Sequence, residues 1–340
     1  MSNQQIQIVP YSEDFAEAHC EFAARMWPNK RRRREGTYQR WKFRGPAQGP
    51  LDGLLLAVED GIVLGQLGLI PAVLRVGKNS YPCQWACDLM VDSSLRRKGV
   101  GTLLLKAAMA RPVVTLGSNP SPAADITMSR LGFKPLTGPR IMILPRQLNE
   151  VLAWVMPPSL KKAIPLVSIV GRPIAAFRSR ALIKKAGTEV VTESTWEEIL
   201  RLIEARQSTI DSPHVLHDYQ FMAWRCSGLD GYTAKLEAIQ VDGGFAVIGP
   251  AKHCYYVYEW GAGSKGDFLA LFRAIYRRAA RAKCQTIEVL AHGPQEEQWL
   301  REVRFIGMRT RFKVICYPPE RLIPRYDKFY YCIYDSDGNL

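Results

Sequence analysis

A dense group of basic residues and glycines occupies one short stretch of the chain, Arg96-Arg97-Lys98-Gly99-Val100-Gly101-Thr102. The two glycines lack side chains that would hold a ligand away from the backbone, so consecutive amide N–H groups can converge on an anion. The three cations add positive charge at the same place, and arginine binds phosphate oxygens in pairs. This composition predicts a site for a phosphate or diphosphate group.

The flanking residues predict how this loop is held. Residues 85–91 form a short stretch that is apolar except at Asp88, which is typical of a buried strand. After the loop, apolar residues recur at the spacing of one helix face: Val100, Leu103, Leu104, Ala107 and Ala108. Pro112 then ends the helix. The basic loop therefore joins the end of a strand to the start of a helix, where unpaired N–H groups favour an anion.

The strand end Leu89-Met90-Val91 followed by Arg96-x-x-Gly99-x-Gly101 resembles the pyrophosphate loop of the GNAT (N-acetyltransferase-like) superfamily, which holds coenzyme A. Downstream, Leu131-Gly132-Phe133-Lys134 is similar to the end-of-helix signature of the same family, with Gly132 as the C-cap. The alternative, for the loop alone, is a surface turn between an unrelated strand and helix.

The resemblance implies an acyl-coenzyme A donor, such as acetyl-coenzyme A, and no metal. The residues that it implies for cofactor binding are Leu89, Met90, Val91, Arg96, Arg97, Lys98, Gly99, Val100, Gly101, Thr102 and Asn119. In the family, backbone N–H groups at the positions of Leu89 to Val91 polarise the thioester carbonyl. An amine, or less readily a hydroxyl, then attacks the carbonyl directly.

Acid–base groups for this reaction are few. Asp88 is the only carboxylate on the expected strand and is the predicted general base, unless it serves only to bind the backbone or an arginine. Family members often protonate the leaving thiolate with a tyrosine four residues before the signature glycine. This chain has Met128 there, which cannot donate a proton. Three alternatives are open. Tyr81, Ser129 or water takes the role of the missing tyrosine, or the thiolate leaves without a proton donor, or the protein is no longer a catalyst.

Two residues are candidates for the acceptor side, Trp41 and Arg44, because they lie close together in a polar segment. Packing of Trp41 on the sheet edge is the alternative. The basic run at residues 30–34 fits a solvated surface, or a patch that faces substrate or membrane. The chain end, residues 329–338, is similar to the ends of bacterial tandem GNAT-like proteins of polysaccharide metabolism. The expected acceptor is therefore a small-molecule or glycan-precursor amine.

The composition favours an anionic partner, since 46 Lys and Arg residues against 32 Asp and Glu give a net charge of +14. Coenzyme A phosphates, an acyl carrier protein and anionic lipid fit this charge. The missing aromatic platform motif argues against nucleic acid.

The eight cysteines do not have the spacing of a zinc site and are expected to be free thiols. The histidines at 214 and 217 are expected to be ordinary polar residues. No secretion signal is seen, so we expect a cytoplasmic protein.

The predicted fold class is α/β, with a mixed sheet. Strands are expected at 6–9, 54–58, 62–70, 81–91, 112–116 and 141–144, and helices at 15–26, 100–111 and 123–131. The expected organisation is a GNAT domain at 1–145, a basic and apolar helical linker at 146–188, and a degenerate GNAT-like domain at 189–340. The linker either packs across both domains or touches anionic lipid, without spanning the membrane.

The second domain is predicted to be a faded copy of the first. Four matches carry this repeat: Trp41 with Trp224, Asp60-Gly61 with Asp242-Gly243, Trp85 with Trp260, and Gly132 with Gly307, at offsets of 183, 182, 175 and 175. Tandem GNAT proteins and, more distantly, FemAB-like aminoacyl transferases show such pairing. Residues 261–266 lack the arginine and the Gly-x-Gly of the first loop, so this copy is expected to shape the acceptor cleft without binding coenzyme A. The final strand is expected at 329–334.

Two functions are consistent with these features. The first is an acyl-coenzyme A-dependent N-acyltransferase whose first domain binds the donor. The second is a non-catalytic module that binds acyl-coenzyme A or an acyl carrier protein.

Overall fold

The computed structural model describes residues 6–29, 35–46, 49, 51–95, 98–146, 182, 192–193, 195–227, 236–251, 253–318, 320 and 326–336. We call residues 6–146 the first lobe, residues 192–318 the second lobe, and residues 326–336 the C-terminal segment. Nearly all of the expected linker at 146–188 lies outside the described residues. The proposed boundaries at 145 and 189 therefore stay predictions.

The first lobe contains six strands and four α-helices among its described residues. In chain order they are β1 (Gln7–Pro10), α1 (Ala16–Met26), α2 (Gly36–Arg44), β2 (Leu54–Glu59), β3 (Ile62–Val76), β4 (Asn79–Val91), α3 (Val100–Met109), β5 (Val114–Ser118), α4 (Pro122–Arg130) and β6 (Lys134–Pro145).

The second lobe repeats this order with one short additional strand, β8. Its elements are β7 (Thr192–Glu193), α7 (Trp196–Gln207), β8 (His214–Val215), α8 (Tyr219–Ser227), β9 (Glu237–Val241), β10 (Gly244–Ala251), β11 (Cys254–Ala262), α9 (Lys265–Arg281), β12 (Thr286–Ala291), α10 (Pro294–Glu302) and β13 (Ile306–Tyr317). The predicted α/β class with a mixed sheet is confirmed.

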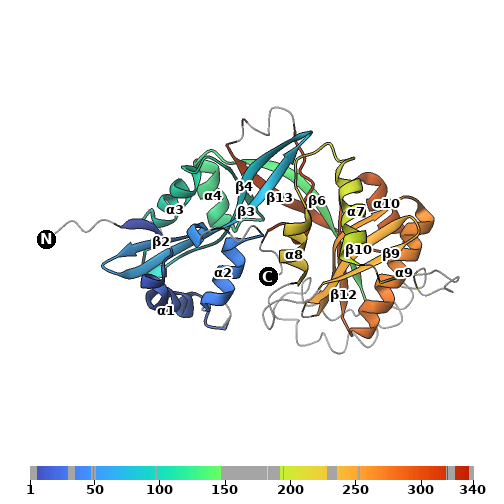
Figure 1. Cartoon of the computed structure of the whole chain (residues 1–340), viewed down its shortest axis with the longest axis horizontal. Helices are drawn as coiled ribbons and strands as arrows, with labels where there is room; N and C mark the ends of the chain where they lie inside the picture. The colour runs from blue at the N-terminus through green and yellow to red at the C-terminus, as the bar shows by residue number, and fades with distance from the viewer. Residues whose placement is uncertain are drawn as a thin grey trace.

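Both lobes share one sheet, in the order β1-β2-β3-β4-β5-β13-β6-β12-β11-β10-β9-β7, with β8 paired to β3. The last strands of the lobes are exchanged: β13 pairs with β5 of the first lobe, and β6 pairs with β12 of the second. β13 and β6 also pair with each other, and they cross the centre of the molecule in red and green (Figure 1). Each lobe is therefore completed by a strand of the other.

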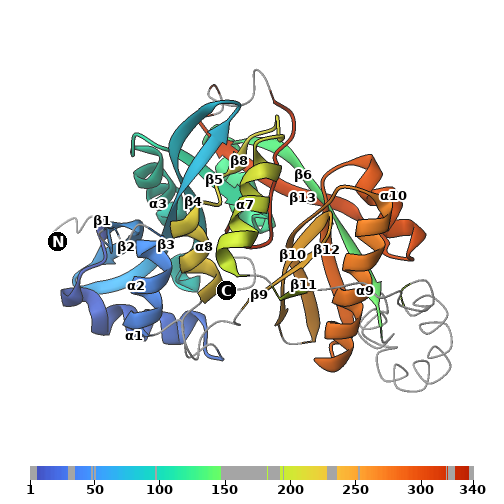
Figure 2. The ribbon, with the colours of Figure 1, turned by 45° about the vertical axis from the view of Figure 1, so that its right-hand side comes forward.

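Helices cover both faces of the sheet. α3 and α4 cover a core in the first lobe that includes Leu104 and Met128, and α9 and α10 cover one in the second that includes Phe272 and Leu300. The opposite face carries the largest core, which runs through both lobes and includes residues of α1, α7, α8 and the C-terminal segment. α7 and α8 lie at the junction of the lobes (Figures 1 and 2).

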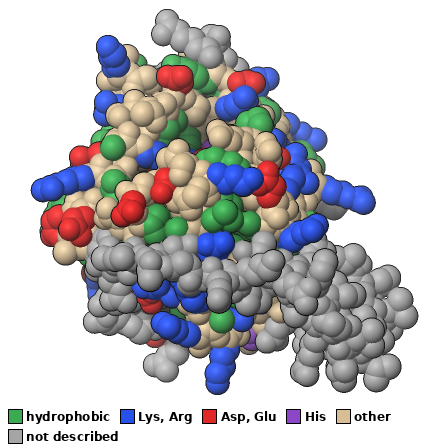
Figure 3. Space-filling model, turned by 90° about the vertical axis from the view of Figure 1, so that its right-hand side faces the viewer, with side chains coloured by type: hydrophobic (Ala, Val, Ile, Leu, Met, Phe, Trp, Pro, Cys, Tyr) green, Lys and Arg blue, Asp and Glu red, His purple; other side chains and the backbone are tan. Residues whose placement is uncertain are grey.

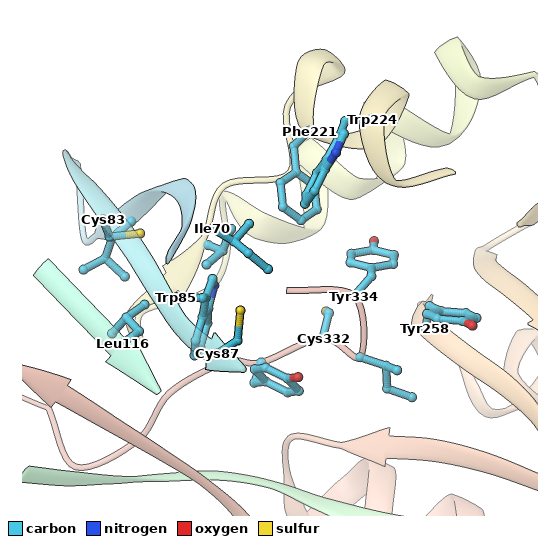
Figure 4. Close-up of a cluster of buried hydrophobic side chains, with 14 of the residues drawn as sticks. Ile70, Cys83, Trp85, Cys87, Leu116, Phe221, Trp224, Tyr258, Cys332 and Tyr334 are labelled. Carbon is cyan, nitrogen blue, oxygen red and sulfur yellow. The ribbon is translucent and has the colours of Figure 1, made fainter. Parts of the chain in front are cut away.

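The C-terminal segment fills this junction. The expected strand at 329–334 is wrong, because residues 328 and 330 make only isolated bridges, to Thr137 and His214, before the chain turns. Cys332 and Tyr334 lie between Trp85 of β4 and Tyr258 of β11 (Figure 4). Trp85 packs edge-on against Tyr331, and Tyr258 stacks on Tyr334. Aromatic packing therefore fastens the segment to both lobes.

The structure supports the predicted repeat but corrects its register. α2 and α8 align at 183, and the β2–β3 and β9–β10 turns align at 182, as expected. In contrast, β4 pairs with β5 over Cys83–Ala86, and β11 pairs with β12 over Cys254–Val257, which gives an offset of 171. Trp260 thus corresponds to Leu89, and the expected match with Trp85 is wrong.

The helix-end match needs the same kind of correction. Gly132 at φ +94° is followed by Phe133, whose N–H donates to the Met128 carbonyl. In the second lobe, Arg304 at φ +74° is followed by Phe305, whose N–H donates to Leu300. Arg304 therefore takes the place that Gly307 was expected to have.

The cysteines are free thiols, as the sequence predicted. All eight cysteines lie in the described part and are free, and six of them are buried. Among the described helices, none has the length and apolar character needed to cross a bilayer. On the second-lobe face shown in Figure 3, Lys and Arg side chains lie among Asp and Glu side chains. The net positive charge therefore does not gather into one patch on that visible face.

Candidate functional site

The site begins where β4 and β5 separate. Their parallel pairing runs from Cys83 opposite Val114 to Ala86 opposite Gly117, and β4 then continues to Val91 while paired to β3. The β3–β4 register shifts just beyond Cys87, which marks a β-bulge. Asp88, at this bulge, has φ +50°, a backbone conformation that is uncommon outside glycine. The bulge turns the end of β4 away from β5 and opens the sheet.

A cleft of about 690 Å³ lies next to this opening. Its lining comes from the end of β4, the start of α3, and α4: Leu89, Met90, Val91, Leu95, Gly99, Val100, Gly101, Thr102, Ser121, Ala123, Ala124, Thr127 and Arg130. Seven of the eleven predicted cofactor-binding residues are in this list. The structure therefore brings the predicted strand end and the predicted glycine loop together around one cavity.

The start of α3 presents backbone N–H groups to this cleft. Gly99 is the N-cap at φ +86°, and no side chain caps the helix. The first intrahelical bond joins the N–H of Leu103 to the Gly99 carbonyl at 3.0 Å, so the preceding N–H groups have no partner inside the helix. A Cβ on Gly101 would lie 3.7 Å from Val91, inside the lining of the cleft. The two glycines thus allow the turn and keep the cleft open.

The remaining predicted cofactor residues lie elsewhere or outside the described part. Arg96 and Arg97 lie outside the described residues, and Lys98 is exposed beside the helix start. Asn119 does not line the cleft. Its side-chain oxygen accepts from the N–H of Lys313 at 2.8 Å, and its own N–H donates to the Lys313 carbonyl. Asn119 therefore joins the end of β5 to β13.

Asp88 lies on the α2 face of the sheet, where it pairs with a buried lysine. Lys42 Nζ lies 2.7 Å from Asp88 Oδ2, and the two side chains are 0% and 9% exposed. The backbone carbonyl of Asp88 accepts from Gln66, whose own carbonyl oxygen accepts from His19 Nε2. Burial lowers the pKa of His19. The carboxylate predicted as the base thus has a charged partner, and the chain of contacts reaches α1.

Sequence reasoning missed Lys42, although a signal was present. Tyr38, Gln39, Lys42 and Phe43 are the buried positions of α2, which is the spacing of one helix face. A lysine on that face must be paired, because lysine is almost never fully buried alone. Its ammonium also lies over the ring of Phe43, at 5.3 Å from the centroid.

Neither Tyr81 nor Ser129, the two candidate side chains for thiolate protonation, is among the residues that line the cleft. Tyr81 pairs with Leu74 at the start of β4, the end farthest from the bulge. Met128 is the buried residue of α4, and its terminal carbon would lie 3.1 Å from a Cβ built on Gly117. Met128 thus occupies the space beside the strand opening with an apolar group.

The predicted acceptor residues belong to the contact between the lobes. The rings of Trp41 and Trp224 lie 5.5 Å apart, and Trp224 Nε1 donates to the Trp41 carbonyl at 2.9 Å. These two residues, matched by the repeat, therefore pack against each other. Arg44 lies at the end of α2, and its Nε is buried without a hydrogen-bond partner in the described structure.

A buried charge cluster occupies the equivalent position in the second lobe. Glu259 lies at the bulge of β11 and accepts from His217 Nδ1 at 3.0 Å, while His217 Nε2 lies 2.6 Å from Asp335. Tyr334 also donates to Glu259. Burial alone would lower the pKa of His217, but Glu259 and Asp335 outweigh burial and raise it to about 10. The pair His217 and Asp335 fixes the C-terminal segment to the second lobe.

Comparisons with known proteins agree with this geometry. Residues 7–112 match the family profile described as an acetyltransferase (GNAT) domain. No curated protein matches the chain in sequence. A GCN5-related N-acetyltransferase from Kribbella flavida has a similar structure, with a TM-score of 0.59 and 13% identity over 92% of this chain and 71% of that one.

Two further solved structures share the fold. A GCN5-related N-acetyltransferase from Anabaena variabilis aligns with a TM-score of 0.61 and 10% identity, over 91% of this chain and 72% of that one. The Saccharomyces cerevisiae N-myristoyltransferase with bound myristoyl-CoA aligns with a TM-score of 0.60 and 13% identity, over 93% and 79%. The match of residues 7–112 to the acetyltransferase (GNAT) domain profile confirms the resemblance inferred from the glycine loop.

Proposed function

We propose that this protein is an acyl-coenzyme A-dependent N-acyltransferase. The observation that carries the proposal is the cleft at the opening between β4 and β5, which joins an uncapped helix start to the end of β4 beyond its pairing with β5. The N–H groups of residues 99–102 would bind the diphosphate of coenzyme A, with Arg96, Arg97 and Lys98 adding charge. Residues 89–91 would hold the pantetheine arm and polarise the thioester carbonyl.

The acceptor amine would attack from the face that carries α2. Asp88 lies on that face beside the opening, and we assign it the general-base role, directly or through one water. The second lobe and the C-terminal segment close this face, as the contact of Trp41 with Trp224 illustrates. A small-molecule or glycan-precursor amine stays the expected acceptor, while an acyl carrier protein and an anionic membrane surface stay further proposals.

Donor binding and thiol release test the proposal in sequence. Acetyl-coenzyme A should raise the melting temperature, because a ligand that binds only the folded state stabilises it. Sustained release of free thiol with a panel of candidate amines would support the transferase. Donor binding without turnover across the panel would support the binding module instead, and absence of binding would refute both.

The role of Asp88 needs a matched pair of variants. Asp88→Asn should lower kcat by about 10²- to 10⁴-fold. It also removes the carboxylate from buried Lys42, which costs about 3–5 kcal/mol of unfolding free energy. The double variant Asp88→Asn with Lys42→Met removes both charges and should recover much of that stability. Normal turnover in a stable double variant would contradict the base assignment.

A further inference from the structure

The C-terminal segment places a row of hydroxyl groups beside the opening in the first lobe. Ser336 Oγ lies 2.8 Å from Ser118 Oγ of β5, and Tyr331 Oη lies 2.8 Å from the same Ser336 oxygen. Tyr331 and Ser336 are 1% and 2% exposed, while Ser118 is only partly buried. The row thus runs from a buried phenol to a hydroxyl at the end of β5.

Ser118 lies at the edge of the opening between β4 and β5, although it is not among the residues that line the cleft. It directly follows Gly117, the last residue of β5 that pairs with β4. Gly117 contacts Met128 on the α4 side, and successive strand residues point to opposite faces. Ser118 therefore points to the face of Asp88 and the C-terminal segment, at the edge of the opening where the thioester would lie under the proposed function.

We propose that Ser118 protonates the departing thiolate, and that Ser336 and Tyr331 resupply its proton. This inference rests on the proposed function. When the tetrahedral intermediate collapses, the C–S bond breaks and its electron pair stays on sulfur. Ser118 Oγ gives its proton to sulfur, Ser336 gives one to Ser118, and Tyr331 gives one to Ser336. Tyr331 is buried, so it regains its proton through Ser336 from Ser118, the partly buried end of the row, and this proton balances the one that the attacking amine loses.

The second lobe positions this row. Arg225, 5% exposed, donates from Nη2 to the Ser336 carbonyl at 2.9 Å, and it also interacts electrostatically with Tyr331. A guanidinium at this place favours transient negative charge on the neighbouring oxygens. Asp335 accepts from the N–H of Cys332 and is paired to His217. The proton path would therefore be an element that the second lobe supplies to the first, in place of the missing tyrosine at Met128.

Variants that remove single hydroxyls test the path. Ser118→Ala should lower kcat about 100-fold, with KM and the Kd for acetyl-coenzyme A within twofold of the wild-type values. Ser118→Thr keeps the hydroxyl and should retain at least about a tenth of the wild-type kcat. Tyr331→Phe should also lower kcat. Because the groups act in series, the double variant Ser118→Ala with Tyr331→Phe should have about the same kcat as the more impaired of the two single variants.

Exposed residues of the same types give matched controls. Ser80→Ala and Tyr219→Phe should leave kcat unchanged. A kcat for Ser118→Ala above half the wild-type value would overturn the inference and leave the proposed function standing. So would losses that multiply in the double variant, or a loss matched by weaker donor binding. A wild-type protein that binds acetyl-coenzyme A but never releases thiol would overturn both.

Discussion

The two lobes open their sheets in the same way and use the opening differently. In the first lobe the strands part after Ala86 and leave a cleft of about 690 Å³. In the second lobe β11 and β12 part after Val257, and Trp260 fills the gap. Trp260 is 2% exposed, and its Nε1 donates to the Leu290 carbonyl at 2.9 Å. One side chain therefore fills, in the second lobe, the space that is an open cleft in the first.

The helices that follow the two openings differ in the same sense. The start of α3 has no side-chain cap and no acidic residue in its first turn. At the start of α9, Ser264 Oγ accepts from the Asp267 N–H at 3.2 Å and donates to the Asp267 carboxylate at 2.7 Å. The start of the first helix thus has neither a side-chain cap nor a carboxylate, whereas the start of the second has both.

The opposite face of the openings is preserved in both lobes. At the offset of 171, Asp88 corresponds to Glu259, and each carboxylate is paired with a buried basic group, Lys42 or His217. The comparison teaches that the lobes differ more on the face covered by α3 and α9 than on the face that carries Asp88 and Glu259.

The largest expected effect concerns the residue that fills the second opening. Trp260→Ala should lower the unfolding free energy by about 3–5 kcal/mol, because it empties a fully packed site. Leu89→Ala at the corresponding position should cost about 1 kcal/mol, since Leu89 is half-buried beside an open cleft. Urea unfolding of both variants measures the difference. Equal losses would contradict the assignment of one open and one filled site.

The second-largest expected effect concerns donor binding at the start of α3. The second residue of α3 and of α9 is glycine in both cases, Gly101 and Gly266. Gly101→Val should weaken acetyl-coenzyme A binding about 100-fold, or about 2.8 kcal/mol, because the side chain would enter the cleft. Gly266→Val is the matched control at α9 and should leave binding unchanged. Calorimetric titration gives both values. Weaker binding in Gly266→Val would place a donor site in the second lobe.

The smallest expected effect is the change in unfolding free energy per pH unit that arises from the pair His217 and Glu259 in the second lobe. The folded pKa of His217 is about 10, above its ordinary value of 6.5, so its contribution to stability is full below pH 6.5 and is lost as pH rises through about 10. The slope is at most about 1.4 kcal/mol per pH unit. Glu259→Gln removes one carboxylate and should flatten this slope in urea unfolding, while His253→Asn, at an exposed site, should not. An unchanged slope in Glu259→Gln would contradict the proposed coupling.

Local patterns carried the prediction of the cofactor side. The strand end, the glycine loop and the helix face of residues 88–111 are contiguous in sequence, so their spacing fixes their geometry. The acceptor side could not be predicted in this way, because Lys42, Asp88 and Gln66 meet only through pairing of distant segments.

The repeat illustrates a second limit. Turns such as Asp60-Gly61 mark their own position, so the offset of 182 held. A tryptophan does not fix the alignment of the two lobes, because a large apolar residue can occupy many different core positions. Trp85 packs on the C-terminal segment and Trp260 fills the opening of β11 and β12, and no periodicity distinguishes these two surroundings.

The exchange of β6 and β13 has a consequence for how the molecule is made. Until residues 306–317 have been synthesised, the slot between β5 and β6 stays vacant, with backbone groups of both strands unpaired. The amino-terminal half therefore cannot finish folding on the ribosome and must wait for the far end of the chain. Each lobe needs a strand of the other to complete its part of the sheet, so neither lobe should fold alone. A fragment that ends after residue 146 should therefore be prone to aggregation.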